Sequence, residues 1–248
     1  MPTPLPDSDA RIFDVMYQCR AMRRLKQDPV PDEMLLRLVD AALRAPSGSN
    51  AQNWAFVIVR DLEQKRRIQT LWQRAWRFYL DTAAKAELRP HEDAPARERM
   101  LRAANQLADH LHEVPALIFV AVQRDEAFAK VLASAGTFRK AVGHLGPGTT
   151  ARLLAAGLRT AGLADGATAY PAVQNLLLAA RALGLGAVLT TLHFFLPGEL
   201  ERVVDLPSSA TLAAIVPVGF PRGRFGPVSR PAVEAVVSWD RWRRPSPR

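Results

Sequence analysis

Cysteine is nearly absent from this chain of 248 residues, in which Cys19 is the only one. A lone cysteine cannot form an internal disulfide or a thiolate metal cluster. Histidine is also scarce, and His110 and His112 stand two positions apart, a spacing that directs them to different sides of a helix. Because no carboxylate pair accompanies them at metal-ligand spacing, we expect no metal site.

Long apolar runs and targeting signals are missing as well. No uninterrupted apolar run approaches the roughly 20 residues that a membrane-spanning helix needs. Residues 1–10 lack the basic and apolar regions of a signal peptide and read as a loose arm. We therefore expect a soluble, cytoplasmic protein with no membrane partner.

The glycine patterns that bind nucleotide phosphates are also absent. Segment 143–150 is rich in glycine, but it lacks the lysine of a P-loop and follows no clear strand. The turn 184–186 lies between a helix and a strand, which is the wrong context for a dinucleotide-binding fingerprint. A redox cofactor, if one binds, is therefore not held by a Rossmann-type turn.

The charge balance is basic, with 33 lysines and arginines against 24 acidic residues and a net charge of +9. Such an excess raises the question of anionic partners. The arginines are spread along the chain, however, and their densest group lies in 241–248. This distribution is typical of a solvated surface, so we expect no nucleic-acid partner.

With 48% hydrophobic residues, the chain can build one sizeable core or two small ones. Apolar residues at helical spacing predict helices over 11–25, 32–44, 62–88, 97–112, 171–183 and 199–205. Apolar runs predict strands over 54–60, 116–122, 187–192 and 213–220, with 116–122 central in the sheet. The interval 124–166 shows no readable pattern. The mixture predicts an α+β fold.

Proline and glycine positions refine these elements. Pro171 suits the first position of a helix, and Gly184 suits the residue past its end. Pro217 lacks an N–H, which predicts an edge strand or a bulge. Gly186 either lets a ligand approach the backbone or serves a tight turn. Helix 171–183 is apolar all round, which indicates burial, here across a subunit interface. The tail from 221 has no core pattern and is expected to pack on another element, such as a second subunit.

The loop 45–54, Ala-Pro-Ser-Gly-Ser-Asn-Ala-Gln-Asn-Trp, separates a helix from a strand. Pro46 ends the helix, and Gly48 can adopt a positive φ. The loop then carries five small or amide side chains: Ser47, Ser49, Asn50, Gln52 and Asn53. Such uncharged donors and acceptors suit the edge of a planar, polar heterocycle such as a flavin. An ordinary turn is the alternative, because these residue types are common in turns.

Two other groups are candidates for a site. Arg20 and Arg23 stand three apart, so in a helical turn they share a face and can hold a phosphate, or they are simply solvated. The expected helix 62–88 carries four aromatic residues close together. They indicate a core or a subunit interface, with a substrate-pocket wall as the alternative: Trp72, Trp76, Phe78 and Tyr79.

Several blocks together resemble the nitroreductase family. They are Cys-Arg-Ala-Met-Arg-Arg-Leu at 19–25, Asp-Pro-Val-Pro at 28–31, the loop 45–54, the segment 174–186, Val-Gly-Phe-Pro at 218–221 and Arg-Pro at 230–231. The blocks follow the family order and span 19–231, whereas 62–165 matches poorly. In this family that middle region builds substrate specificity.

The resemblance implies an α+β fold with a central, mostly antiparallel sheet flanked by helices, in an intertwined homodimer. The FMN-binding domain would cover 11–231, and 232–248 would be an extension packed on the partner subunit. FMN would carry the chemistry without a catalytic side chain, and NAD(P)H would reduce it. A small nitroaromatic or quinone-like electron acceptor would follow in ping-pong order. The alternatives are an oxidase or dehydrogenase of a biosynthetic intermediate, and a flavin-binding module without turnover.

The resemblance also implies cofactor-binding residues. Arg20 and Arg230 would bind the FMN phosphate, beside Ala21, which replaces a frequent serine, and Arg23 would lie near the ribityl chain and the pyrimidine edge. A second set would approach from the partner subunit: Pro46, Ser47, Gly48 and Asn50. A third would lie along the flavin face with backbone groups near N5: Thr190, Thr191 and Leu192, with Thr168 as a weaker member. Asn53 stands where the family usually has proline.

Overall fold

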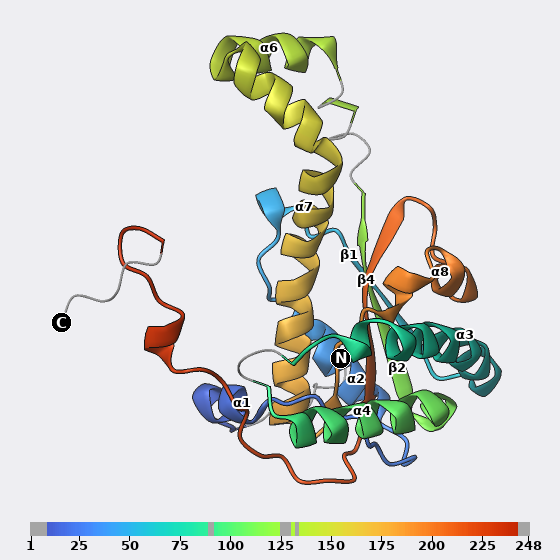
Figure 1. Ribbon diagram of the computed structural model, residues 1–248. Coiled ribbons are helices and arrows are strands. Elements are labelled where there is room, and N and C mark those ends of the chain that lie inside the picture. The colour runs from blue at the N-terminus through green and yellow to red at the C-terminus, as the bar shows by residue number, and fades with distance from the viewer. Residues whose placement is uncertain (1–8, 89–91, 125–129, 132–133, 243–248) are drawn as a thin grey trace.

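The computed structural model describes residues 9–88, 92–124, 130–131 and 134–242. The expected arm 1–10 and the arginine-rich end 241–248 therefore lie mostly outside the described residues. The centre is a four-stranded antiparallel sheet with the strand order β1-β2-β4-β3 (Figure 1). Its strands are β1 (Trp54–Val59), β2 (Ala116–Gln123), β3 (Gly186–Ala187) and β4 (Ala210–Gly219). The α+β fold with an antiparallel sheet is confirmed.

β2 and β4 form the middle of the sheet, with Ile118 paired to Val216. Every residue of β2 from Ala116 to Val122 is buried, as its apolar run predicts. The prediction that Pro217 marks an edge strand or a bulge was wrong, because β4 lies between two strands and the register shift falls at Val120/Ala121. Ile215 exchanges hydrogen bonds with Thr190 on the β3 side, so the nitrogen of Pro217 also faces that side. There β3 has only two residues, and proline interrupts no continuous ladder.

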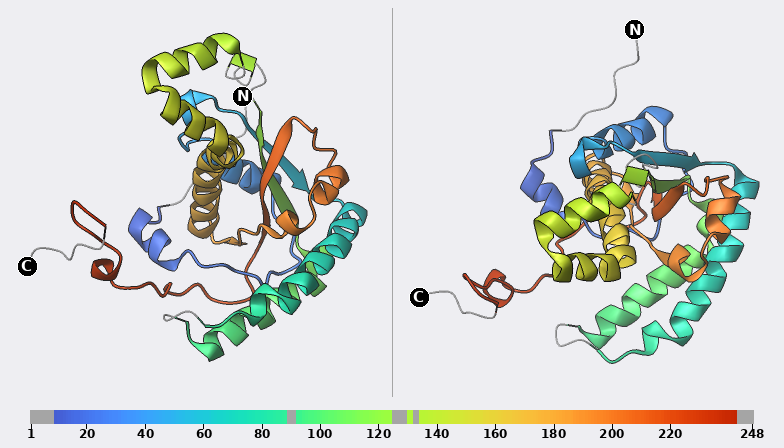
Figure 2. Two further views of the ribbon diagram at one scale, coloured as in Figure 1. Left: turned by 45° about the horizontal axis from the view of Figure 1, so that its top comes forward. Right: turned by 90° about the horizontal axis from the view of Figure 1, so that it is seen from above.

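Helices cover both faces of the sheet, as Figure 2 shows from two directions. On one face α2 (Asp32–Ala42) and α7 (Pro147–Ala182) pack on Ile118 and Val120. On the other face α3 (Leu62–Asp81), α4 (Ala94–Asp109) and α8 (Glu199–Val203) pack on Leu117 and Phe119. The alternation of β2 side chains between the two clusters is the period of two expected for a strand.

Three of the expected helices differ from their predicted bounds by several residues, and the others by three residues or fewer. α3 ends at Asp81 rather than at 88. α1 covers only Ile12–Gln18, and the chain that follows is extended rather than helical. The helix predicted to begin at Pro171 is the second half of α7, which starts at Pro147 and keeps Pro171 inside it. Pro147 occupies the early position that favours proline, and Gly184 follows the end of α7 with a φ of 75°. α6 (Ala135–Leu145) and the start of α7 project from the body (Figure 1).

The chain after β4 turns back along the segment that follows α1. Lys26 N–H donates to Phe220 O at 2.7 Å, and Arg222 N–H donates to Arg24 O at 2.9 Å. Val228 N–H donates to Tyr17 O at 2.9 Å, which continues the pairing. Residues 221–230 therefore pack on their own chain, which corrects the expectation that the whole tail packs elsewhere. Beyond them the tail extends away from the body (Figure 1).

Gly186 serves chain packing rather than a ligand. A Cβ at this position would lie 2.7 Å from Leu25 Cδ2, 3.0 Å from Met22 Cβ and 3.3 Å from Pro221 Cβ. The segment after α1 can thus lie on β3 only because this residue has no side chain. Of the interpretations of Gly186, the ligand approach was wrong for this chain.

None of the described helices combines the length and the apolarity that crossing a bilayer requires.

We predict that Gly186→Ala lowers the free energy of unfolding by about 1–3 kcal/mol, because the new methyl group overpacks a closed contact. Gly143→Ala is the matched control, since Gly143 lies in α6 and a Cβ there meets nothing within 4 Å. The control should keep stability or raise it by up to about 1 kcal/mol. Urea unfolding of both variants measures the difference, and equal stability of the two would contradict the packing role.

Candidate functional site

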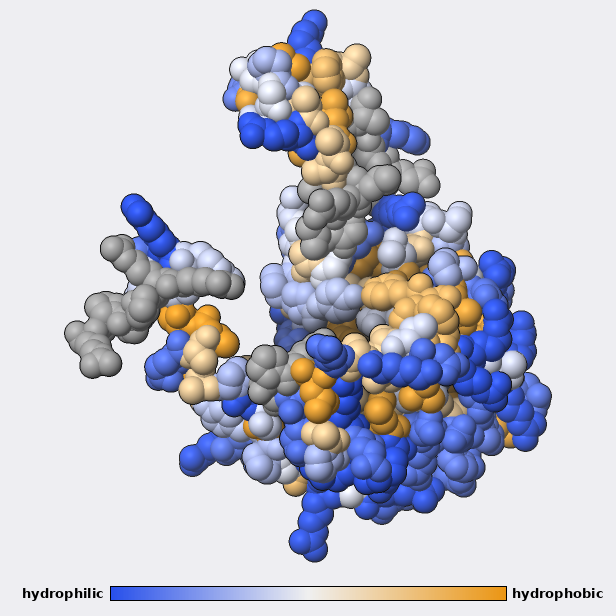
Figure 3. Space-filling view, viewed as in Figure 1, coloured by the Kyte–Doolittle hydropathy of each residue, from blue (hydrophilic) through white to orange (hydrophobic). Residues whose placement is uncertain are grey.

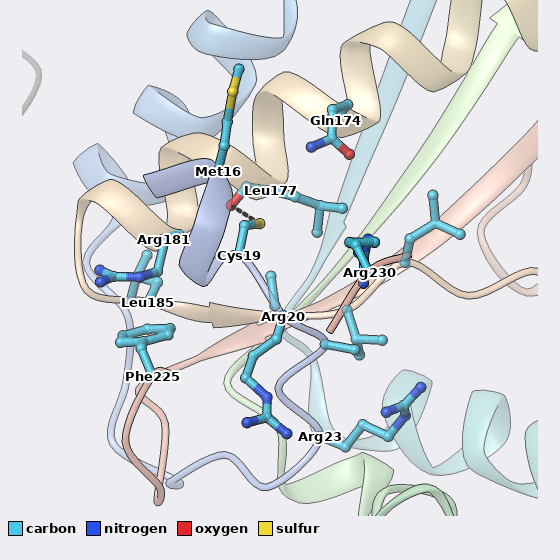
Figure 4. A pocket seen from close by; sticks show the side chains of 14 residues that line it. Met16, Cys19, Arg20, Arg23, Gln174, Leu177, Arg181, Leu185, Phe225 and Arg230 are labelled. Carbon is cyan, nitrogen blue, oxygen red and sulfur yellow. Dashed lines mark hydrogen bonds between the residues drawn. The ribbon is translucent and has the colours of Figure 1, made fainter. Parts of the chain in front are cut away.

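A first cavity of about 290 Å³ opens where the segment after α1, the end of α7 and the C-terminal segment meet (Figure 4). Four arginines lie among its lining residues: Arg20, Arg23, Arg181 and Arg230. The remaining lining residues are uncharged: Met16, Cys19, Ala21, Gln174, Leu177, Leu185, Ala187, Val188, Leu189 and Phe225. No described carboxylate lines this cavity, so its electrostatic character is strongly positive.

Two of the four arginines are engaged within the chain. Arg181 Nη2 donates to Gln18 Oε1 at 2.6 Å, and its guanidinium lies 4.1 Å from the centre of the Phe225 ring. Arg230 Nη1 donates to the adjacent carbonyl of Ser229 at 2.7 Å. Arg20 and Arg23 form no ion pair with any described residue. The cavity therefore offers uncompensated guanidinium groups, which are the donors that suit phosphate and carbonyl oxygens.

Burial lowers the pKa of the Arg23 guanidinium, an effect that Tyr79 opposes and Arg20 reinforces. An arginine stays protonated in proteins, so the lowered pKa means that the charge is poorly solvated. An anionic or carbonyl ligand would relieve this cost. The neighbouring Cys19 behaves differently, because burial raises the pKa of its thiol, and its Sγ–H donates to Leu177 O at 3.6 Å.

The expectation that Arg20 and Arg23 share a helical turn was wrong, because α1 ends at Gln18. The extended segment brings both to the cavity instead, and its position is fixed where Met22 N–H donates to Ala187 O at 3.0 Å. In Figure 4 the Arg20 side chain extends downward from this segment, whereas the Arg23 side chain extends to the right. Arg230 reaches the cavity from the opposite end of the chain.

A second cavity of about 370 Å³ shares Arg23 and Leu189 with the first. Its walls come from α3, α4 and the segment after β3: Trp72, Trp76, Tyr79, Met100, Ala104, Leu107, Thr190, Thr191, Leu192, Phe194 and Phe195. Trp76 and Tyr79 stack with ring centres 5.1 Å apart and planes 16° apart. Three of the four aromatic residues of α3 thus line a cavity. Trp72 and Trp76 are also buried members of the core, as the interpretation favoured from the sequence predicted.

Phe78 differs from its neighbours on α3. It was interpreted from the sequence as part of a core or a subunit interface, and in this chain the residue is 53% exposed. Its ring contacts the edge of Phe195 with centres 5.2 Å apart. Phe78 therefore supports the rim of the second cavity from outside.

The segment 190–193 is held against β4. Both backbone groups of Thr190 pair with Ile215, so they cannot serve a ligand. The Thr191 N–H, in contrast, has no acceptor among the described residues. The buried His193 Nε2–H donates to Leu212 O at 3.0 Å and anchors the segment. Of the backbone N–H groups that the sequence placed near a ligand, those of Thr191 and Leu192 have no acceptor among the described residues and remain available.

The loop 45–54 and Thr168 form a separate group. Trp54 Nε1 donates to the carbonyl of Thr168 at 2.9 Å, and Ser47 Oγ accepts from Gln52 N–H at 3.1 Å. The left-handed conformation occurs at Ser49, Asn50 and Gln52 and not at Gly48, where the sequence had suggested it. Pro46, Ser47, Gly48, Asn50 and Thr168 line neither cavity.

The distance along α7 explains this separation. A helix rises about 1.5 Å per residue, so Thr168 and Arg181 lie about 20 Å apart along the axis. The loop contacts the Thr168 part of α7, whereas the first cavity adjoins Gln174, Leu177 and Arg181. Within one chain, the implied cofactor residues therefore form two groups on different parts of the surface.

Several lining residues were missed in the sequence. Arg181 could have been recognised from the sequence, because it is the only charged residue in the apolar segment 171–183. A charge on such a helix requires a partner or a ligand. Gln174, Leu177 and Phe225 carried no such signal, because only the packing of α7 and the returning tail brings them to the cavity. The described residues hold no group of three potential metal ligands.

A model of the nitroreductase family matches residues 17–220. The chain belongs to the nitroreductase family. The NADH dehydrogenase of Thermus thermophilus is 30% identical over 239 residues, which cover 96% of this chain and 100% of the relative. The iodotyrosine deiodinase of Thermotoga neapolitana is 25% identical over 210 residues, covering 85% and 88%. The family resemblance noted in the sequence is thereby confirmed.

The same fold occurs in a solved structure of another protein. Oxidized iodotyrosine deiodinase bound to FMN and 3-iodo-L-tyrosine matches this chain with a TM-score of 0.64 at 24% identity. The match covers 94% of this chain and 100% of that one. Relatives of this family thus include different reactions on one fold, so the substrate must be argued from the residues of this chain.

His193 makes the stability of this region dependent on pH. Burial lowers its pKa from 6.5 to about 4, so as the pH falls the unfolded chain takes up the proton first. The free energy of unfolding therefore keeps the full contribution of neutral His193 above about pH 6.5. It falls by about 3 kcal/mol as the pH is lowered to about 4. We predict that His193→Gln, which keeps a donor for Leu212 O, unfolds in urea with a flatter dependence between pH 7 and pH 4. If the stability of the wild type and of His193→Gln depended on pH in the same way, this role of His193 would be contradicted.

Proposed function

We propose that this chain is an FMN-dependent oxidoreductase that passes electrons from NAD(P)H to a small nitroaromatic or quinone-like acceptor by a ping-pong mechanism. The observation that carries the proposal is the convergence of Arg20, Arg23 and Arg230 on a cavity that no described carboxylate lines. A second, largely apolar cavity shares Arg23 and gives room for a further ligand.

The donors of the first cavity fit FMN. Arg20 and Arg230 would bind the phosphate, while Ala21 supplies no hydroxyl group to it. The desolvated Arg23 would stabilise negative charge at the pyrimidine edge, which favours the reduced flavin. The Thr191 N–H would donate to the flavin ring near N5. These groups would therefore bind, orient and stabilise charge, and no side chain is assigned the role of an acid or a base.

Bound FMN would supply the two-electron redox chemistry, taking a hydride from NAD(P)H and reducing the acceptor. Reduction of a quinone to a hydroquinone consumes two electrons and two protons. Reduction of a nitro to a nitroso group consumes the same and releases water. One NAD(P)H and one proton from solvent balance either reaction. The apolar second cavity would exclude bulk water from the acceptor.

A homodimer accounts for the separated loop. The first cavity is at the lower end of the usual volume range for ligand sites, about 300–1,000 Å³, so a second copy would complete it. Residues 46–50 of that copy would reach the flavin, as the family resemblance implies. Apolar side chains are exposed on α1, on the projecting α6–α7 hairpin (Figure 3) and on the tail, including Phe13, Leu154 and Trp242. Such surfaces suit an interface between two copies.

The names of two similar proteins support the redox assignment. One is an NADH dehydrogenase, and the other is an iodotyrosine deiodinase whose solved structure holds FMN. The decisive experiment is an anaerobic titration of the purified flavoprotein with NADH or NADPH, followed at the flavin absorbance. We predict bleaching by the nicotinamide and recovery on addition of one equivalent of a quinone or nitroaromatic compound.

The same titration separates the alternatives. A yellow protein that NAD(P)H does not reduce would be a flavin-binding module without turnover. Reduction by an organic substrate, with rapid oxygen consumption and no response to NAD(P)H, would indicate an oxidase or a dehydrogenase. A protein that binds no flavin would contradict the proposal outright.

The dimer is tested with Leu178, a half-buried residue of α7 that lines neither cavity, whereas its neighbour Leu177 lines the first. We predict that Leu178→Glu abolishes dimerisation and FMN binding together, because the charge would be buried in the interface. The control Leu62→Glu, at the exposed start of α3, should affect neither. Sedimentation recorded at the flavin absorbance measures both properties. A wild-type monomer with stoichiometric FMN would contradict the shared site.

A further inference from the structure

The second cavity is aromatic and holds a single charge. Arg23 is the only charged residue among the described residues that line it, and Thr190 and Thr191 bring the only hydroxyl groups besides that of Tyr79. Two acidic groups, on α8 and α4, are engaged elsewhere. Glu199 pairs with Arg74 at 2.8 Å, and Glu98 pairs with Arg102. The cavity thus offers a cation and aromatic surface, but no described carboxylate.

The aromatic rings are arranged to hold a flat ligand. The Trp76 ring is fixed twice, by its stacking on Tyr79 and by a hydrogen bond from its Nε1 to Asn105 Oδ1. Phe195, which also lines the cavity, is held by its contact with Phe78. Rigid aromatic walls of this kind favour planar aromatic ligands through stacking and edge contacts.

The charge decides between classes of aromatic ligand. An ammonium group that enters an apolar cavity must find a carboxylate or several carbonyl groups, and here it would meet the like charge of Arg23. A neutral ring, or a ring that carries a carboxylate or phenolate, meets no such penalty and gains a partner for the desolvated guanidinium. The related deiodinase structure holds 3-iodo-L-tyrosine, an amino acid with an ammonium group.

We propose that the second cavity is the electron-acceptor site and that it selects planar aromatic acceptors without an ammonium group. Neutral and anionic aromatic compounds are accepted, and aromatic amino acids are rejected. This assignment rests on the proposed function, because it names the substrate class of the same site. It separates this chain in specificity from the iodotyrosine deiodinases to which it is similar.

A matched pair of acceptors tests the selection. 3-(4-Nitrophenyl)propanoate and 4-nitro-L-phenylalanine differ only in the α-ammonium group and carry the same reducible nitro group. With the FMN-loaded enzyme and saturating NAD(P)H, we expect kcat/KM for the propanoate to exceed that for the amino acid at least tenfold. Equal values, or a preference for the amino acid, would overturn the proposal.

Binding of non-reducible analogues separates this proposal from the proposed function. Titration calorimetry with 3-phenylpropanoate and L-phenylalanine needs neither a reductant nor turnover. We expect the propanoate to bind at least tenfold more tightly. If this preference appears without any NAD(P)H-dependent turnover, the selection stands and the proposed function fails. If turnover occurs but neither pair is discriminated, the selection fails and the proposed function stands.

A reversal of the selection tests the physical cause. Met100 lies on α4 in the cavity wall and is half-buried, so a polar residue of similar length can replace it without disturbing the core. Met100→Glu should lower the preference for the propanoate over the amino acid at least fivefold, because the new carboxylate pairs with the ammonium group. Met100→Gln has the same shape without the charge and should keep the wild-type preference. An unchanged preference in a folded, FMN-loaded Met100→Glu enzyme would contradict the electrostatic cause.

Discussion

The antiparallel contact between the segment after α1 and the chain that leaves β4 is the constraint on which the candidate site depends. Met22 is bonded to β3, and Lys26 and Arg24 are bonded to the chain at Phe220 and Arg222. Because Gly186 leaves space under Met22 and Leu25, the segment lies directly on the sheet. Through this contact, Arg20 and Arg23 near one terminus meet Arg230 near the other.

The contact also sets the electrostatics of the site. It places guanidinium groups between the end of α7 and the sheet, where no described carboxylate lines the cavity. Arg23 borders both cavities, so a charge at one position influences the ligand in each. His193 fixes the segment 190–192, which lines the second cavity, by a buried bond to β4. The fold thereby joins an anion-binding cavity to an apolar aromatic one, an arrangement suited to a charged cofactor beside an organic acceptor.

The elements that could be predicted from the sequence are those in which local pattern and packing agree. The continuous apolar run of β2 and the amphipathic pattern of α2 determined their positions to within a few residues. Pro171 misled the prediction, because proline favours a first turn, yet α7 continues through it and buries Ala172, Val173 and Leu176 against the sheet. Tertiary packing there outweighs a local preference.

The site divides in the same way. The arginines and the loop 45–54 could be recognised because their residue types and order are characteristic of a family. The sequence could not predict that these residues divide into a cavity group and a distant loop group. That division depends on which part of α7 each segment contacts. The aromatic wall was visible in α3, but only its approach to Phe194 and Phe195 makes it a cavity.

The central claim is that the arginine-lined cavity binds the phosphate of FMN. The most direct test compares the dissociation constants of FMN and riboflavin, which differ by that phosphate, in the wild type, Arg20→Ala and Arg230→Ala. A charge-assisted hydrogen bond contributes about 1.5–3 kcal/mol, so the wild type should bind FMN at least tenfold more tightly than riboflavin. Each variant should lose tenfold or more in FMN affinity and little in riboflavin affinity. Equal affinity of the wild type for both flavins, or unchanged FMN affinity in both variants, would contradict the account.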